Sequence, residues 1–312
     1  MSFLETLVSI LTPELLATTF RISTPIILAA LGGTMCEKSG VINIGLEGMM
    51  LAGAFAAVFI SHVYQNAVLG AVGGVLCGGI FGLILAFGAI TLRANQIVLG
   101  AAINIFVGGL TGFLTTVIFS PGASARVPGL KPMSIPVLRD IPWIGTMLFS
   151  HAATVYLAFS LAILGHFLFY RTPLGTWIRA AGDRPLALHS AGKNVKRIRY
   201  LAVVLSGCLA GLGGVHLSLS ITRHFTVNMS GGRGFLGLAA NIFGKWTPLG
   251  SLWASLFFGF SESLKFKSAV LRIPPEILII MPFVLTLIVL VSVVGRAEAP
   301  QALGEVYDVE RE

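Results

Sequence analysis

Charged residues are scarce in this sequence. Asp, Glu, Lys and Arg make up 11% of its 312 residues, whereas an average soluble domain carries about 25%. A chain with so little charge cannot cover a soluble surface, so an ordinary soluble enzyme is excluded. Hydrophobic residues reach 55%, and there are 37 glycines. This composition is typical of apolar helices that pack closely through small residues, and it indicates a protein that crosses a membrane several times.

Cysteine is nearly absent as well. The three cysteines are an odd number, lie in or beside apolar stretches and lack the spacing of metal ligands: Cys36, Cys77 and Cys208. We therefore expect no metal site and interpret the thiols as small packing groups. The first cation is Arg21. The positively charged start of a cleavable signal peptide is thus missing, and we expect the N-terminus to be retained.

The sequence motifs of enzymes are also missing. Gly232 to Gly237 matches the dinucleotide pattern G-x-G-x-x-G, but neither the strand nor the βαβ unit that this motif needs is visible. The stretch from Ala239 to Trp246 ends in Gly-Lys, yet a P-loop needs Gly in place of Ala239 and Ser or Thr in place of Trp246. G-x-S-x-G, H-E-x-x-H and paired-cysteine sites do not occur, and the six histidines are scattered. We expect no catalytic residues and no cofactor in this chain.

What the sequence does contain is a series of apolar runs, each long enough to cross about 30 Å of hydrocarbon as a helix. Eight runs lie at roughly 14–34, 43–61, 67–92, 97–119, 151–170, 200–221, 248–264 and 276–295. A ninth, shorter piece from Phe235 to Phe243 is either re-entrant or completes a span. The predicted fold is all-α, a single polytopic domain over 1–312 with about 8 to 10 transmembrane helices, including broken or re-entrant segments.

The distribution of cations orients these spans. Seven of the 21 Lys and Arg residues lie within 171–199, where an even spread would place about two, so this loop is cytoplasmic by the positive-inside rule. Residues 120–150 then form an extracytoplasmic loop, in which five prolines break any long helix. The cluster of Lys265, Lys267 and Arg272 favours a re-entrant short piece, but that arrangement leaves the polar tail 296–312 outside, so the side of the tail stays open. Basic and aromatic residues do not alternate in the loop, which argues against nucleic acid as a partner.

Three sets of glycines repeat at a spacing of four. Gly70, Gly74, Gly78 and Gly82 follow one another along one predicted helix, and the pairs Gly207/Gly211 and Gly108/Gly112 repeat the pattern. Such faces let helix backbones approach closely.

The basic loop contains a short predicted helix. Pro185 lies at its first turn and Gly192 marks its stop, which predicts a helix from about Arg184 to Ala191. Two helical turns alone are marginal in water. The helix therefore holds by packing on its own spans or on a partner, and the alternative is a solvated loop.

Polar residues inside the apolar runs are candidate functional groups, because such residues usually face a cavity or a partner. Asn43 and Glu47 lie four residues apart and share a face if the helix has already begun. The glycines around them predict a broken or re-entrant helix start. Further candidates are Asn104, Asn241, Arg21 and Glu262. For each of them, a hydrogen bond to a neighbouring helix is the alternative.

Four segments, taken in order, resemble the permease subunits of bacterial ABC importers for simple sugars and nucleosides, a superfamily related to the ribose and branched-chain amino acid permeases. They are Glu37–Ala54, Ala94–Asn104, Ala181–Val195 and Gly231–Gly250. The first and last are most similar to the nucleoside branch. The third resembles the coupling helix that docks on the ATPase.

The resemblance implies a multi-pass permease of the cytoplasmic (inner) membrane that is itself not an enzyme. Its implied partners are a second, homologous permease, an ABC ATPase subunit that binds ATP and Mg, and an extracytoplasmic substrate-binding protein. The implied coupling residues are Asp183, Arg184, Pro185, Leu186, Ala187, Leu188, Ala191 and Gly192. The candidates for the substrate pathway are Asn43, Glu47, Asn104, Asn241 and Phe243.

The predicted substrate is a nucleoside, ahead of simple sugars of the ribose or galactose type. A nucleoside offers a stackable base and a hydroxylated ribose, so its pathway needs apolar walls and amide partners. A sugar pathway uses the same residue types, and the choice therefore depends on the resemblance. A single-chain channel or secondary transporter is the alternative of a different class, and a membrane-embedded enzyme is a weaker one.

Overall fold

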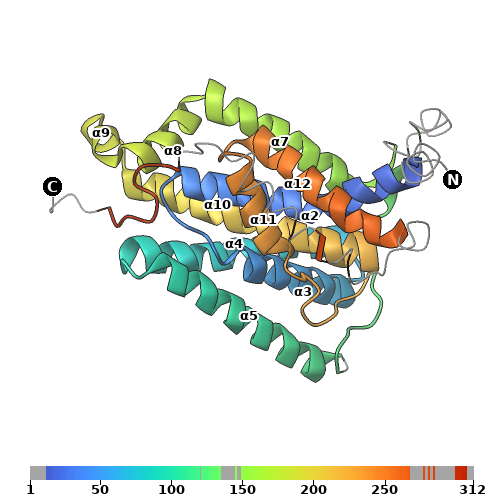
Figure 1. Cartoon of the computed structure of the whole chain (residues 1–312). Coiled ribbons are helices and arrows are strands. Elements are labelled where there is room, and N and C mark those ends of the chain that lie inside the picture. Colours follow the sequence, from blue (N-terminus) through green and yellow to red (C-terminus); the bar gives the residue numbers. More distant parts are fainter. Residues whose placement is uncertain are drawn as a thin grey trace.

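The computed structural model describes residues 12–119, 121–134, 145, 149–267, 277, 280, 281, 284 and 299–307. Within them the chain is a bundle of helices (Figure 1). Two strands, β1 (Pro132–Ser134) and β2 (Ser150–Ala152), pair antiparallel at the edge of the bundle. The predicted all-α class is confirmed.

Six of the described helices are long and apolar enough to cross a membrane. They are α2 (Pro13–Lys38), α3 (Leu46–Tyr64), α4 (Ala67–Ala86) with its π-helical extension η1 (Phe87–Thr91), α5 (Gln96–Ile118), α7 (Ala153–Arg171), and α10 (Val195–Val215) with the π-helix η2 (His216–Thr222). Each matches a predicted run. The seventh run is the 16-residue helix α12 (Pro248–Ser263), followed by η3 (Leu264–Lys267). Most of the eighth run, 276–295, lies outside the described residues.

Helix starts follow ordinary capping chemistry. The Asn66 side chain accepts hydrogen bonds from the first amides of α4, and Asn95 does the same for α5. Thr12 and Thr247 cap helices whose first residue is proline. A side-chain oxygen at the cap satisfies backbone donors that have no partner within the helix, so these residues fix where the spans begin.

The glycine faces bring α4, α10 and α3 into backbone contact. A Cβ on Gly78 would lie 2.7 Å from Gly211 Cα, and one on Gly53 would lie 2.6 Å from the same atom. The close approach predicted for the α4 series and for Gly207/Gly211 is confirmed. For Gly108 and Gly112 it is wrong: a Cβ there would meet only side chains, at 3.8 and 3.7 Å, because α5 packs on α3 through another face.

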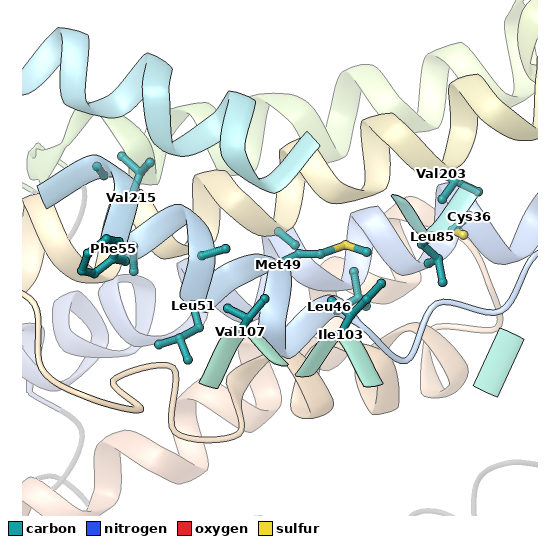
Figure 2. Packing of buried hydrophobic residues seen from close by; sticks show 14 of the residues in the cluster. Cys36, Leu46, Met49, Leu51, Phe55, Leu85, Ile103, Val107, Val203 and Val215 are labelled. Carbon is teal, nitrogen blue, oxygen red and sulfur yellow. The ribbon is translucent and has the colours of Figure 1, made fainter. Parts of the chain in front are cut away.

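A hydrophobic core forms where α3, α5 and α10 meet (Figure 2). This core contains Met49 and Phe55 of α3, Val107 of α5 and Val215, which is the last residue of α10. Cys36 is buried in this core and Cys77 packs against it. All three cysteines are free, in agreement with their interpretation as packing groups.

The short piece becomes helix α11 (Arg233–Phe243), which runs alongside α2. Its start lies next to Glu47, and its end reaches Glu37 at the end of α2 that meets the basic loop. Helix α12 then runs back along α2, with Ser251 beside Thr34 and Ser263 beside Thr19. Helix α11 therefore runs from beside Glu47 to the basic-loop end of the bundle, and α12 runs back from there.

This path shows at which end of the bundle the tail lies. The segment 299–307 lies at the end of the bundle that carries the basic loop, since Ala302 N donates to Gly182 O at 2.8 Å (Figure 1). Lys265 lies at the opposite end, where Phe266 borders the same cavity as Arg21 and Ser150. The inference that the cation cluster favours a re-entrant piece is wrong, because α11 and α12 form a hairpin whose turn lies at the basic-loop end.

Candidate functional site

Two helix starts meet at Glu47. Helix α3 begins at Leu46, so Glu47 lies in its first turn. Its carboxylate oxygens accept hydrogen bonds from Gly232 N at 2.8 Å and Gly234 N at 2.6 Å, at the start of α11. A helix start carries partial positive charge and unpaired amides, so a carboxylate is the complementary group. A Cβ on Gly234 would lie 2.5 Å from Glu47 Cα, which is why the close approach needs glycine there.

The turn before α3 is held by two asparagines. Asn104 of α5 accepts a hydrogen bond from Gly48 N at 2.7 Å and donates one to Ile44 O at 3.0 Å. Asn43 donates to Ser206 Oγ of α10 at 2.9 Å. The helix has not yet begun at Asn43, so Asn43 and Glu47 do not share a helical face. Residues 41–45 before α3 are non-helical, and α3 itself is continuous from Leu46 to Tyr64.

These groups lie midway along the bundle. Asn104 and Ser206 are near the middle of α5 and of α10 with its extension, and Gly237, one turn into α11, packs on Ala29 in the middle part of α2. Asn43 is fully buried, whereas Glu47 and Asn104 are partly exposed. The site thus combines a carboxylate and an amide, both partly exposed, at mid-depth.

The remaining two predicted pathway residues lie elsewhere. Asn241, at the far end of α11, donates to the Glu37 carboxylate at 2.8 Å and accepts from Thr34 Oγ1 at 2.8 Å. The Phe243 ring packs on Phe258, with centroids 5.7 Å apart. The structure therefore brings Asn43, Glu47 and Asn104 together and separates Asn241 and Phe243 from them.

Glu37 is the polar residue that sequence reasoning missed. It is buried at the end of α2, where its carboxylate accepts hydrogen bonds from Asn241 and from the Trp246 indole N–H. Thr34 and Ser251 extend the network into α12. A signal was available, because Glu37 opens a segment with strong resemblance and lies just after an apolar run, but its partners are more than 200 residues away in sequence.

The other two polar candidates are at the end of the bundle opposite the basic loop. Glu262 of α12 pairs with Arg233 at 2.6 Å and with Lys265 at 2.9 Å, which ties the start of α11 to the end of α12. Arg21 is exposed. Neither residue contacts the group around Glu47 among the described contacts.

The basic loop forms two helices, α8 (Pro173–Asp183) and α9 (Pro185–Ser190). The predicted short helix is therefore confirmed, with Pro185 at its first position and Gly192 at φ +73° just beyond it. Leu188 is buried and anchors α9 to Ile178, Val195 and Ile198. The other predicted coupling residues face outward or are partly exposed: Asp183, Arg184, Pro185, Leu186, Ala187, Ala191 and Gly192. A groove of about 570 Å³ runs between the two helices.

Within the described part of the chain, no group of three metal-ligating side chains comes together. The site around Glu47 offers hydrogen bonds and one negative charge, with no nucleophile and base in contact. Such an arrangement can bind and orient a neutral polar molecule.

Comparisons with known proteins show the family of the chain. Residues 15–290 match the family described as branched-chain amino acid transport system / permease component. The chain is 40% identical to the guanosine ABC transporter permease protein NupQ of Bacillus subtilis, over 91% of this chain and 92% of the relative. It is 35% identical to the nucleoside ABC transporter permease protein NupC of Lactococcus lactis, over 91% and 93%. It is 32% identical to a putative glucose ABC transporter permease protein, TsgC13 of Haloferax volcanii, over 95% and 98%. No solved structure matches.

Proposed function

Because the chain belongs to the family of branched-chain amino acid transport system permease components, we propose that it carries nucleosides across the cytoplasmic membrane into the cell. It is a multi-pass membrane protein and the permease component of an ABC transporter, hence a transport protein and not an enzyme. In the proposal, ATP and Mg are bound and ATP is hydrolysed by a separate ATPase subunit. An extracytoplasmic binding protein delivers the substrate.

The observation that carries the proposal is the meeting of two helix starts at mid-depth. Transporters commonly place substrate sites near the bilayer midplane, where helices are discontinuous. Here the first turn of α3 contains Glu47, and α11 begins beside the Glu47 carboxylate. Each carboxylate oxygen accepts one backbone hydrogen bond and keeps lone pairs for further donors. We assign these to the hydroxyl groups of a ribose.

The apolar part of a nucleoside needs a different wall. Phe235, in the first turn of α11, is 47% exposed and directly follows Gly234, whose amide donates to Glu47. Its ring is available to stack on a base. Phe243 and Trp246 pack against other parts of the chain, so we leave them, with Asn241, out of the substrate contacts.

Helix α9 is the proposed docking element for the ATPase. Its exposed residues Leu186 and Ala187 project beside the groove between α8 and α9, while Leu188 anchors the helix. Movement of the ATPase would then turn the permease as a rigid body and expose the pathway alternately to the two sides.

The proposed second permease pairs through α5. This helix packs on α3 by one face and exposes Ile105, Phe106 and Phe113 on the other. The small residues Gly108, Gly109 and Gly112 lie along it, and a Cβ on Gly109 would meet nothing within 4 Å. Asn104 of this helix bonds the backbone on both sides of Glu47, so a partner on α5 would lie beside the proposed substrate site.

Uptake by cells that express the chain with its partners tests the substrate. We expect labelled guanosine to accumulate, and excess adenosine or uridine to reduce that accumulation. The 32% identity to a putative glucose permease protein favours sugars as the second candidate. Accumulation of labelled ribose or galactose that excess nucleoside leaves unchanged would replace the nucleoside proposal with the sugar one.

A further inference from the structure

The last turn of α8 is capped by residues that are distant in sequence. A helix leaves its final carbonyl groups without partners inside the helix. Here Ala181 O accepts a hydrogen bond from the Arg199 guanidinium at 3.1 Å, and Gly182 O accepts one from the Ala302 amide at 2.8 Å. Two of the last carbonyl groups of α8 thus accept hydrogen bonds, one from α10 and one from the segment 299–307.

Arg199 connects α10 to α8 and to the segment 299–307. It is 2% exposed, and it also donates to Glu305 O at 2.9 Å. Its guanidinium lies over the Tyr307 ring, 5.9 Å from the centroid. Gly40 makes room for it, since a Cβ there would lie 2.7 Å from Arg199 Nη2. A buried guanidinium needs several acceptors to offset its desolvation, and backbone oxygens of α8 and of segment 299–307 supply them.

The segment makes two further attachments. Gly304 N donates to Gly40 O at 3.0 Å, which ties the segment to the turn before α3. The Tyr307 ring packs on the cluster that holds α9, formed by Leu188, Val195 and Ile198. Segment 299–307 therefore contacts α8, α9, α10 and the turn that leads to Glu47.

We propose that residues 299–307 form a strap that holds the α8–α9 loop in one orientation, with Arg199 and Tyr307 as positioning residues for coupling. The coupling part rests on the proposed docking of α9 on the ATPase. A six-residue helix is not stable alone, so it transmits motion to the bundle only if the rest of the protein holds it. The strap connects it both to α10 and to the turn beside the substrate site.

The first arm of the test measures amide hydrogen exchange of residues 176–193 in the purified full chain. Tyr307→Ala removes the ring from Arg199 and from the α9 cluster, and we expect exchange at 184–192 to become about tenfold faster, as in a local opening. The separate variant Tyr307→Phe keeps the ring, so its exchange should be as slow as in the wild type. Val306→Ala, at an exposed neighbour, should leave exchange unchanged. If amide exchange at 184–192 in Tyr307→Ala is as slow as in the wild type, the proposed strap is wrong.

The second arm uses the assembled transporter and measures substrate uptake per ATP hydrolysed. Tyr307→Ala should lower this ratio about tenfold while the ATPase still co-purifies, because a loosened loop binds but transmits less motion. Arg199→Gln should do the same, with the exposed Arg197→Gln as its control. An unchanged ratio with faster exchange overturns the positioning role. If the wild-type chain binds no ATPase, the proposed function fails, and the exchange arm still decides the strap.

Discussion

At the scale of single residues, Glu47 joins the two helices that border the proposed substrate site. Its carboxylate lies in the first turn of α3 and accepts two backbone hydrogen bonds from the start of α11. Interaction of a carboxylate with a helix start stabilises by about 0.3–1 kcal/mol, and up to ~2 kcal/mol when partly buried. Glu47 therefore fixes how the two helices meet, and any molecule at this point encounters a negative charge.

The variants Glu47→Ala and Glu47→Gln separate these two roles. Glu47→Ala leaves the amides of Gly232 and Gly234 without an acceptor, which costs roughly 1–3 kcal/mol for each buried donor. We expect a lower melting temperature and no uptake. Glu47→Gln keeps one acceptor oxygen but turns its NH2 group toward the second amide, so it should melt between the wild type and Glu47→Ala and transport less. Glu14→Gln, an exposed carboxylate of α2, is the control. Wild-type uptake in Glu47→Ala would remove the residue from the pathway.

The buried Glu37 has a structural role at the other end of α11. Trp246→Phe keeps an aromatic ring, although a smaller one, and removes the indole N–H that donates to this carboxylate. Removing one hydrogen-bond partner of a buried polar group costs about 1–3 kcal/mol, so thermal unfolding should occur at a lower temperature. Trp253 is 69% exposed, and Trp253→Phe should not change the melting curve. Equal melting of both variants would show that the Trp246 hydrogen bond adds nothing to stability.

At the scale of elements, glycine spacing alone did not distinguish a packed helix face from an open one. The faces of α4 and α10 meet backbone to backbone, whereas Gly108 and Gly112 of α5 have the same spacing and contact no helix backbone. The spacing makes close approach possible, and the apolar partners on other helices decide whether it occurs.

Substitution of one glycine from each face gives a matched pair. A Cβ on Gly211 would lie 2.7 Å from Gly74 O, whereas one on Gly109 meets nothing within 4 Å. Overpacking costs about 1–3 kcal/mol, so Gly211→Val should melt at a lower temperature and Gly109→Val should melt like the wild type. If Gly109→Val also reduces co-purification of the second permease, the proposed pairing through α5 gains support. Equal stability of the two variants would contradict the packing account.

The helix α9 has its own test. Ala187 is exposed, so Ala187→Asp should leave the melting temperature unchanged while its charge opposes docking. We expect at least tenfold lower uptake, since a buried unpaired charge at an interface costs several kcal/mol. Ala187→Ser, which is small and uncharged, should retain most uptake. An Ala187→Asp variant that binds the ATPase and transports at the wild-type rate would show that α9 is not the docking element.

At the scale of the whole molecule, the sequence predicted what depends on neighbours in the chain. The helices of the first seven apolar runs and the short helix from Pro185 follow from apolar runs and proline, and the structure confirms them; most of the eighth run lies outside the described residues. The contacts between distant segments could not be predicted in this way. Glu47 meets Gly234, Glu37 meets Trp246, and segment 299–307 meets Gly182. Each pair depends on how the whole bundle packs, which no local pattern encodes.

The central claim is that this chain is a nucleoside permease that works only with a separate ATPase. Reconstitution in liposomes tests it most directly, with labelled guanosine accumulation measured for the chain alone and for the chain with its ATPase, second permease and binding protein. The account predicts accumulation only in the complete assembly and only with ATP, competed by excess adenosine or uridine. Passage of guanosine through the chain alone, or accumulation that needs no ATP, would contradict it.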